Sequence, residues 1–324
     1  MPLFLHLIFS FIFLFPAAQA QGNYPQRPLK IIVPFTPGGS TDILARAIGA
    51  ELTKSLGQAV VIENIAGVGG SIGADRVAKA AADGYTLLMG HVGTLAVNPA
   101  LYPKLPYDPL KDFAAVAFVA RVPNILVVHP SVAANQLAEL LQQAKSKPDA
   151  FNYGSGGNGS AAHTATAYLL SQTNTPMKHV PYRGTAPAVT DLLAGHIQVL
   201  FTGAPAVLAH IKAGKMRPLA VSSPTRLSGL PQVPTVAESG LAGTAEFEAD
   251  QWYGVVAPKG TPESVIKLLN SKINEALLSP EVKTRLLSEG AEPQTKSPQA
   301  FAALIQAEIK RWGPVIRQAD IRPD

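Results

Sequence analysis

The stretch Lys30-Ile-Ile-Val-Pro-Phe-Thr-Pro-Gly-Gly-Ser-Thr-Asp42 constrains the fold of this chain more than any other segment. Its apolar run, residues 31–33, predicts a buried strand, and the prolines and glycines that follow predict a tight loop. Ser40 or Thr41 can cap a helix that begins near Asp42 and continues with apolar residues at helical spacing. Because a glycine loop and a helix N-terminus direct several backbone N–H groups to one place, an anion is favoured there. We expect this place to hold the carboxylate of a small organic acid.

The same succession of strand, glycine-rich loop and helix recurs along the chain. Further strands are expected at residues 59–63 and 84–90, separated by a glycine-rich loop and a helix. Such alternation predicts an α/β fold with a mostly parallel sheet and helices on both faces. In sheets of this kind ligands bind beyond the carboxyl ends of the strands, where the loops 36–41, 67–73 and 91–94 are expected to meet.

The order of the segments predicts two lobes, the second inserted in the first. Two short strands around residues 121–124 mark a passage into a second domain, and the apolar strand 251–257 marks the return. We therefore expect lobe 1 to comprise residues 21–122 and 250–324, and lobe 2 to comprise residues 123–249. Because the chain crosses twice between the lobes, the cleft between them can close on a ligand about a hinge.

The N-terminus has the pattern of a secretory signal peptide. Residues 3–15 are almost wholly apolar and are followed by Ala18-Gln-Ala20, a cleavage pattern of small residues. We expect residues 1–20 to be removed by cleavage near Ala20. No Lys or Arg precedes the apolar run, and a buried N-terminal strand is the alternative interpretation.

Composition narrows the choice of partners. The 324 residues are 47% apolar, carry a net charge of +5 and include no cysteine. A disulfide framework and a lipid-modified N-terminal cysteine are therefore excluded. The positive charges are spread along the chain rather than gathered in a basic patch, so nucleic acid is not expected as a partner. A mild positive balance suits anionic solutes.

A second glycine loop, Gly154-Ser-Gly-Gly-Asn-Gly-Ser160, lies between an expected strand and an expected helix. It satisfies the dinucleotide pattern G-x-G-x-x-G, but no acidic residue ends the next strand, so no nucleotide cofactor is expected. Ser155 resembles a hydrolase nucleophile elbow, yet Tyr153 replaces the first glycine and the acid and histidine do not follow in hydrolase order. We interpret Ser155, Asn158 and Ser160 as hydrogen-bond donors to an oxyanion, with a structural turn as the alternative.

The remaining polar candidates have weaker patterns. The histidines show no metal-ligand spacing, so no metal is expected. His91 and His163 fall on loops assigned to the rim of the cleft, where they contact the ligand or simply pack. Arg183 follows a short strand and can clamp a carboxylate through two hydrogen bonds, or can be a solvated side chain at a turn. Asp42 is interpreted as a partner of the helix start rather than of the ligand.

An ordered series of motifs runs from about Tyr24 to the C-terminus and is more specific than any single motif. The motifs are Pro28-Leu-Lys-Ile-Ile-Val-Pro-Phe-x-Pro-Gly-Gly-x-x-Asp42, Glu63-Asn-x-x-Gly-x-Gly-Gly-x-x-Gly73, Asp83-Gly-Tyr-Thr-Leu87, Leu105-Pro-Tyr-Asp-Pro-Leu-Lys-Asp112, Tyr153-Gly-Ser-Gly-Gly-Asn-Gly-Ser160 with His163, His179-Val-Pro-Tyr-Arg-Gly184, Pro234-Thr-Val-Ala-Glu-Ser-Gly240 and Trp252-Tyr-Gly-Val-Val-Ala-Pro-Lys-Gly-Thr-Pro262. In this order they resemble the Bug family, the extracytoplasmic solute receptors of tripartite tricarboxylate-type transporters.

The resemblance implies a two-lobed periplasmic flytrap that binds citrate-like, dicarboxylic, aromatic or amino acids and passes them to a membrane permease. The first carboxylate is typically held by the loops that match residues 35–41 and 155–160, often with bridging waters. Where the family commonly carries an acid after the strand ending at Phe201, this chain has Thr202, which disfavours an amino-bearing ligand. The expected ligand site is Phe35, Thr36, Gly38, Gly39, Ser40, Thr41, His91, Thr94, Ser155, Gly156, Gly157, Asn158, Gly159, Ser160, His163, Arg183, Thr202 and Gly203.

These expectations describe a receptor rather than an enzyme. The ligand is expected to be a mono-, di- or tricarboxylate, and the protein a monomer without cofactor or metal. Its expected partners are the membrane permease subunits of a tripartite tricarboxylate-type transporter. A sensory receptor that uses the same flytrap, and a secreted α/β hydrolase that uses Ser155, are the alternatives.

Overall fold

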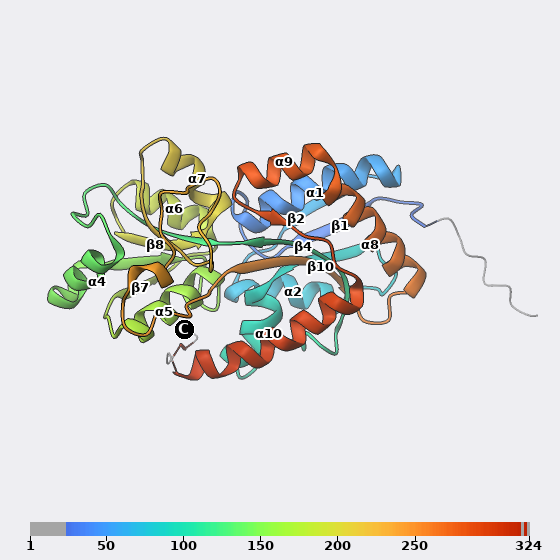
Figure 1. Cartoon of the computed structure of the whole chain (residues 1–324). Helices are drawn as coiled ribbons and strands as arrows, with labels where there is room; N and C mark the ends of the chain where they lie inside the picture. Colours follow the sequence, from blue (N-terminus) through green and yellow to red (C-terminus); the bar gives the residue numbers. More distant parts are fainter. Residues whose placement is uncertain (1–23, 319–320, 323–324) are drawn as a thin grey trace, which may run out of the picture.

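The computed structural model describes residues 24–318 and 321–322, which form two lobes lying side by side (Figure 1). Each lobe has a central sheet with helices on both faces, so the two-lobed α/β fold expected from the sequence is confirmed. The expected signal peptide, residues 1–20, lies outside the described residues. Within them, no helix is both long and apolar enough to cross a membrane.

The sheet of the first lobe has six strands. In sheet order these are β11 (Glu292–Pro293), β4 (Phe113–Val122), β10 (Gln251–Pro258), β3 (Thr86–His91), β1 (Leu29–Val33) and β2 (Val60–Asn64). β1 pairs in parallel with β2 and β3, so the segments that follow these three strands leave the sheet at one edge. The other pairs, β3 with β10, β10 with β4 and β4 with β11, are antiparallel.

Helices cover both faces of this sheet. One face carries α1 (Ser40–Leu56), α8 (Glu263–Leu278) and α9 (Pro280–Ser288), and the other carries α2 (Ser71–Ala78), α3 (Asn98–Leu101) and α10 (Pro298–Gln318). Leu29, Ile31 and Val33 pack in the core beneath α1 and α8, whereas Ile32 points to the opposite core. A parallel strand buried on both faces is a continuous apolar run, which is the pattern of residues 31–33.

The second lobe repeats this arrangement on a smaller scale. Its sheet has the order β7 (Lys178–Pro181), β6 (Asn152–Ser155), β8 (Val199–Gly203), β5 (Asn124–Val128) and β9 (Arg217–Val221). One face carries α4 (Leu137–Ser146) and α5 (Ala161–Thr173), and the other carries α6 (Thr185–Leu193) and α7 (Ala204–Lys212). Four short helical segments, in the connections of both lobes, are η1 (Val68–Gly70), η2 (Gly93–Val97), η3 (Pro148–Ala150) and η4 (Ala237–Ser239).

The chain passes between the lobes at Pro123 and again just before Gln251. β4 ends in the first sheet, β5 begins in the second, and β10 brings the chain back. Because β4 leaves the first lobe and β10 re-enters it, these two neighbours run in opposite directions. Both sheets are therefore mixed. The predicted majority of strands in one direction is present in each, but β10 and β11 in the first sheet and β5 in the second run opposite to the others. The lobe boundaries expected from the sequence stay a proposal.

Two helical segments near the interlobe edge begin differently from the expectation. α1 begins at Ser40, so Ser40 and Thr41 are its first residues, Gly39 is its N-cap, and no side chain caps it. After β3 the chain continues into η2, a π-helical segment, instead of an open loop. The first turn of α1 therefore offers its N–H groups, without a side-chain cap, to the space in front of the helix.

The close contact of β10 with α10 gives a test of the first-lobe packing. A Cβ atom added at Gly254 would lie 2.2 Å from Cζ of Phe301 and 2.8 Å from the carbonyl oxygen of Ala117. We expect Gly254→Ala to lower the free energy of unfolding by about 1–3 kcal/mol, measured as a lower urea midpoint. Gly229→Ala is the control, because a Cβ there meets no atom within 4 Å. Equal midpoints for the two variants would contradict this packing.

Candidate functional site

Where the lobes meet, two helix N-termini line one small space, which we call the inner chamber. α1 of the first lobe and α5 of the second supply the two helix ends. The chamber has a volume of ≈ 20 Å³. It is lined by Phe35, Gly39, Ser40, Thr41, His91, Ser160, Ala161, Ala162, Thr185, Thr202, Gln251 and Tyr253.

The first backbone N–H groups of both helices have no acceptor within their own helix. In α1 these belong to Ser40 and Thr41, and in α5 to Ala161 and Ala162. The side chain of Ser160 caps α5 at the N–H of its third residue, at 3.3 Å, which leaves the two earlier N–H groups uncapped. Each helix N-terminus carries a charge of roughly +0.5, so the two together match the charge of one carboxylate.

Asp42 lies in the first turn of α1 but does not oppose an anion in the chamber. Its carboxylate accepts hydrogen bonds from the N–H of Gly38, from Arg46 and from Asn64, each at 3.0 Å. Burial alone would raise the pKa of Asp42, but these bonds together bring it below its usual value. The carboxylate is therefore ionised and fully partnered by its own surroundings, as expected from its position at the helix start.

His91 presents a neutral imidazole to the chamber. Its Nδ1 accepts a hydrogen bond from the N–H of Thr94 at 3.1 Å, which assigns the proton of the neutral ring to Nε2. Burial lowers the pKa of His91 to about 4, so the ring is uncharged near neutral pH. The ring packs against Phe35 and Tyr253, with centroids 4.8 and 5.8 Å away. His91 therefore lines the chamber as a neutral ring whose proton lies on Nε2, and it adds no positive charge.

The loop between β6 and α5 is held from behind by two histidines. Ser155 is fully buried, and its hydroxyl lies 2.7 Å from Nε2 of His179 and accepts from the N–H of Gly157 at 3.1 Å. At the other end of the loop the N–H of Gly159 donates to Nδ1 of His163 at 3.1 Å. The two imidazole rings stack with centroids 4.1 Å apart. Burial, together with the neighbouring His179, lowers the pKa of His163 to about 3.

Polar side chains from the crossover strands complete the chamber. Gln251, the first residue of β10, donates through Nε2 to Oδ1 of Asn124, the first residue of β5. Its Oε1 accepts from the hydroxyl of Tyr253, so both ends of the amide are fixed. Sequence reasoning missed Gln251, because no spacing rule connects it with the helix start at Ser40. The only signal was a polar residue opening an otherwise apolar strand.

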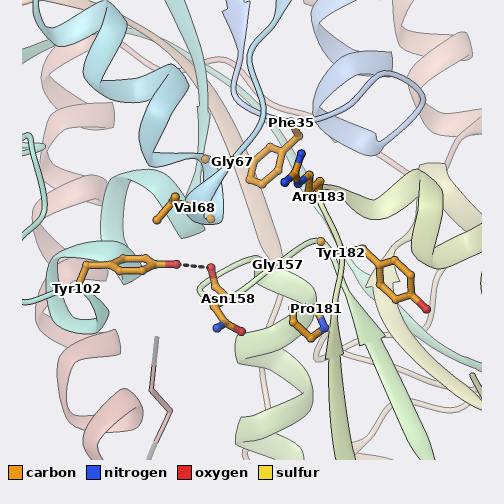
Figure 2. Close-up of a pocket in the computed structure, with 12 residues that line it drawn as sticks. Phe35, Gly67, Val68, Tyr102, Gly157, Asn158, Pro181, Tyr182 and Arg183 are labelled. Atoms are coloured by element: carbon orange, nitrogen blue, oxygen red, sulfur yellow. Dashed lines mark hydrogen bonds between the residues drawn. The ribbon is translucent and has the colours of Figure 1, made fainter. Parts of the chain in front are cut away.

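Phe35 also lines a second, larger cavity, which we call the outer cleft (Figure 2). Its volume is ≈ 320 Å³. Its walls touch where the Tyr102 hydroxyl donates to the carbonyl oxygen of Asn158 at 2.8 Å. A Cβ atom at Gly69 would lie 2.3 Å from the same oxygen, so this approach of the lobes requires glycine. The cleft is lined by Phe35, Gly67, Val68, Gly69, Gly70, Tyr102, Gly156, Gly157, Asn158, Pro181, Tyr182 and Arg183.

The site residues expected from the sequence divide into three groups. The inner chamber is lined by Phe35, Gly39, Ser40, Thr41, His91, Ser160 and Thr202. The outer cleft is lined by Phe35, Gly156, Gly157, Asn158 and Arg183. The third group lines neither cavity and instead shapes the loops around them: Thr36, Gly38, Thr94, Ser155, Gly159, His163 and Gly203.

The geometry does not assemble a hydrolase or a metal centre from the candidates in the sequence. The hydroxyl of Ser155 is buried against Nε2 of His179. Asp191 is engaged elsewhere, by the Tyr182 hydroxyl at 2.6 Å and by His196 at 3.4 Å. Among residues 24–318 and 321–322, no group of three or more His, Asp or Glu side chains comes together in a way that could hold a metal ion. What the arrangement offers is a set of neutral donors around one anion-sized space.

The two buried histidines predict how stability depends on pH. In the folded protein the pKa of His91 is about 4 and that of His163 about 3, below the usual value of about 6.5. The unfolded chain therefore binds more protons between pH 6.5 and about 3, and stability is lost as the pH falls through this range. We expect His163→Gln to reduce the proton uptake on unfolding by about one, measured as the slope of the unfolding free energy against pH. His210→Gln, outside both cavities, is the control, and an unchanged slope in His163→Gln would contradict the assignment.

Three comparisons with known proteins agree with one another. Residues 44–321 match the tripartite tricarboxylate transporter family receptor. The chain is 44% identical over 297 residues to protein BugT of Bordetella pertussis, a match that covers 91% of this chain and 90% of BugT. Among solved structures, Rpa4515 of R. palustris with adipate gives a TM-score of 0.89 at 39% identity, covering 93% of this chain and 100% of that one. MatC from Rhodopseudomonas palustris with bound malate gives 0.87 at 36% identity, covering 90% and 100%.

The three findings lead to the same assignment: the family match covers most of the chain, the relatives align over nearly its whole length, and the fold is shared. The chain belongs to the family of tripartite tricarboxylate transporter receptors, the Bug family of periplasmic binding proteins.

Proposed function

We propose that this protein binds a small organic carboxylate between its lobes and delivers it to the membrane permease of a tripartite tricarboxylate-type transporter. Membership of a receptor family supports a binding role without catalysis. In this proposal residues 1–20 are a signal peptide cleaved near Ala20, and the mature protein is a periplasmic monomer.

One observation carries the proposal: the N-termini of two helices from different lobes line the same chamber. A carboxylate that accepts hydrogen bonds from Thr41 in α1 and Ala162 in α5 touches both lobes at once. Because such contacts exist only when the lobes are closed, the ligand favours the closed state by the free energy of these contacts. Closure then reports occupancy to a partner that recognises the closed protein.

The strength of these contacts is of the order that a receptor needs. A hydrogen bond to a charged group contributes about 1.5–3 kcal/mol, and the four residues whose N–H groups are uncapped all line the chamber. A micromolar dissociation constant corresponds to about −8 kcal/mol. Four such bonds would contribute about 6–12 kcal/mol, and contacts to the rest of the solute must offset the cost of ordering the ligand.

The charges around the two cavities support an acid without an amino group. Among the residues that the structure describes, no Asp or Glu lines the inner chamber or the outer cleft. An ammonium group in the chamber would lose its hydration without gaining a counter-charge, which is costly. The relatives solved with adipate and with malate, both carboxylates without an amine, are consistent with this class.

A thermal-shift screen of mono-, di- and tricarboxylates tests the proposed function. A ligand present at 100 times its Kd should raise the free energy of unfolding by about 2.7 kcal/mol and so raise the midpoint of thermal unfolding. An amide or an amine of the same carbon skeleton should give no shift. A set of shifts that follows uncharged solutes instead of carboxylates would contradict the proposal.

Ala162→Asp tests the site itself, because it places a carboxylate of the protein at the N-terminus of α5. An acidic residue in the first turn suits the helix dipole, so the variant should fold. Its side chain fills the chamber and repels a second anion, so the Kd of the identified acid should rise at least about 100-fold, measured by calorimetry. Ala209→Asp, which adds the same charge on the exposed face of α7, is the matched control. Wild-type affinity in Ala162→Asp would place the ligand elsewhere.

A further inference from the structure

We infer that the solute is a linear dicarboxylate without an amino group, whose second carboxylate binds Arg183 in the outer cleft. The inference rests on the proposed function, because it takes the first carboxylate to lie at the N-termini of α1 and α5. It adds the shape of the solute and the residue that selects it.

The volumes of the two cavities indicate which part of the solute each cavity can hold. The inner chamber measures ≈ 20 Å³, and by the same measure one water molecule needs about 10–15 Å³. It therefore admits one carboxylate group but not a whole organic acid. The body of the solute must lie in the outer cleft, whose ≈ 320 Å³ is ample for an unbranched carbon chain.

The two cavities are consecutive along the same loops, so one solute can occupy both. Phe35 lines both cavities. In the loop before α5, residues 156–158 line the outer cleft and residues 160–162 line the chamber. In the loop before α6, Arg183 lines the cleft and Thr185 the chamber, and their Cα atoms lie within about 7.6 Å because two peptide units join them. A chain that leaves the chamber past Phe35 thus comes within reach of the Arg183 side chain.

Arg183 is a cation available to a ligand. Among the described residues that line the two cavities, it alone carries a charge near neutral pH, since His91 is neutral. Its side chain is exposed, and no ion pair or hydrogen bond ties it to another described residue. Figure 2 draws Arg183 and Phe35 among the residues that line the outer cleft. A guanidinium binds a carboxylate through two parallel hydrogen bonds, which gives both charge and orientation.

The other described residues of the outer cleft carry no charge. They are glycines, Phe35, Val68, Pro181, two tyrosines and Asn158, whose buried Oδ1 accepts no hydrogen bond, so the cleft offers no acidic side chain to an ammonium group. An apolar tail would fill the cleft without using the unpaired Arg183. A second carboxylate is the group that uses both the length of the cleft and its cation.

The test pairs a change in the protein with a change in the solute. Calorimetry measures the Kd of linear dicarboxylates from succinate to suberate, each beside the monocarboxylate with the same number of carbons. We expect the best dicarboxylate to bind the wild-type protein about tenfold tighter than its monocarboxylate partner. Arg183→Gln should raise the Kd of that dicarboxylate about tenfold and change the Kd of the monocarboxylate less than about twofold.

Two further variants make the result specific to the guanidinium. Arg183→Lys keeps the charge but not the fork of donors, so its Kd for the dicarboxylate should fall between those of the wild type and Arg183→Gln. Arg285→Gln removes the same charge from α9, outside both cavities, and should leave both Kd values unchanged. The difference between wild type and Arg183→Gln should also shrink at high ionic strength.

The outcomes separate this inference from the proposed function. Equal effects of Arg183→Gln on the dicarboxylate and the monocarboxylate, or no effect on either, would overturn the inference. If Ala162→Asp abolishes binding while Arg183→Gln keeps the full preference for dicarboxylates, the proposed function stands and the inference fails. If the wild-type protein binds none of these linear acids but binds a tricarboxylate or another acid in the thermal-shift screen, the inference fails and the proposed function stands. If it binds no carboxylate at all, both fail.

Discussion

The account depends on one electrostatic arrangement, in which the positive ends of two helices from different lobes converge on a space without cations. Partial charges of roughly +0.5 at each helix end match one carboxylate without the cost of burying an arginine or lysine. When the lobes close without a bound anion, the partial charges of the two helix ends repel each other. An anion in the chamber therefore has a larger effect on closure than its size suggests.

The surrounding structure keeps that space neutral and shaped. Asp42 lies in the first turn of α1, but its carboxylate accepts hydrogen bonds from Gly38, Arg46 and Asn64. Burial keeps His91 uncharged, and its Nδ1 bond with Thr94 leaves Nε2–H as a donor. The stacked rings of His163 and His179 support the loop of the second lobe in the same way, from behind. Most of the polar residues near the site thus act on the shape of the backbone, and the backbone is what meets the ligand.

Short sequence patterns were sufficient to predict the parts of the site that are formed within a single segment of the chain. The apolar run 31–33 with the glycines after it predicted β1, its loop and the start of α1, and the loop 154–160 predicted the start of α5 in the second lobe. The two-lobed fold followed from the order of such units. Ser155 and His163 were predicted as ligand contacts from their place in the loop, but a loop pattern does not reveal which side chains turn inward to hold it.

Contacts between distant segments could not be predicted in this way. Gln251 and Asn124 are joined only because two crossover strands start side by side, and Thr185 reaches the chamber only when the lobes are together. The mixed sheets have the same origin, since a strand that re-enters a lobe must oppose the strand that leaves it.

The most direct test of the central claim is a crystal structure of the protein with its bound acid. The account predicts carboxylate oxygens about 2.7–3.2 Å from the backbone nitrogens of both Thr41 and Ala162. A carboxylate held by one lobe alone, or an uncharged end of the solute in the inner chamber, would contradict it.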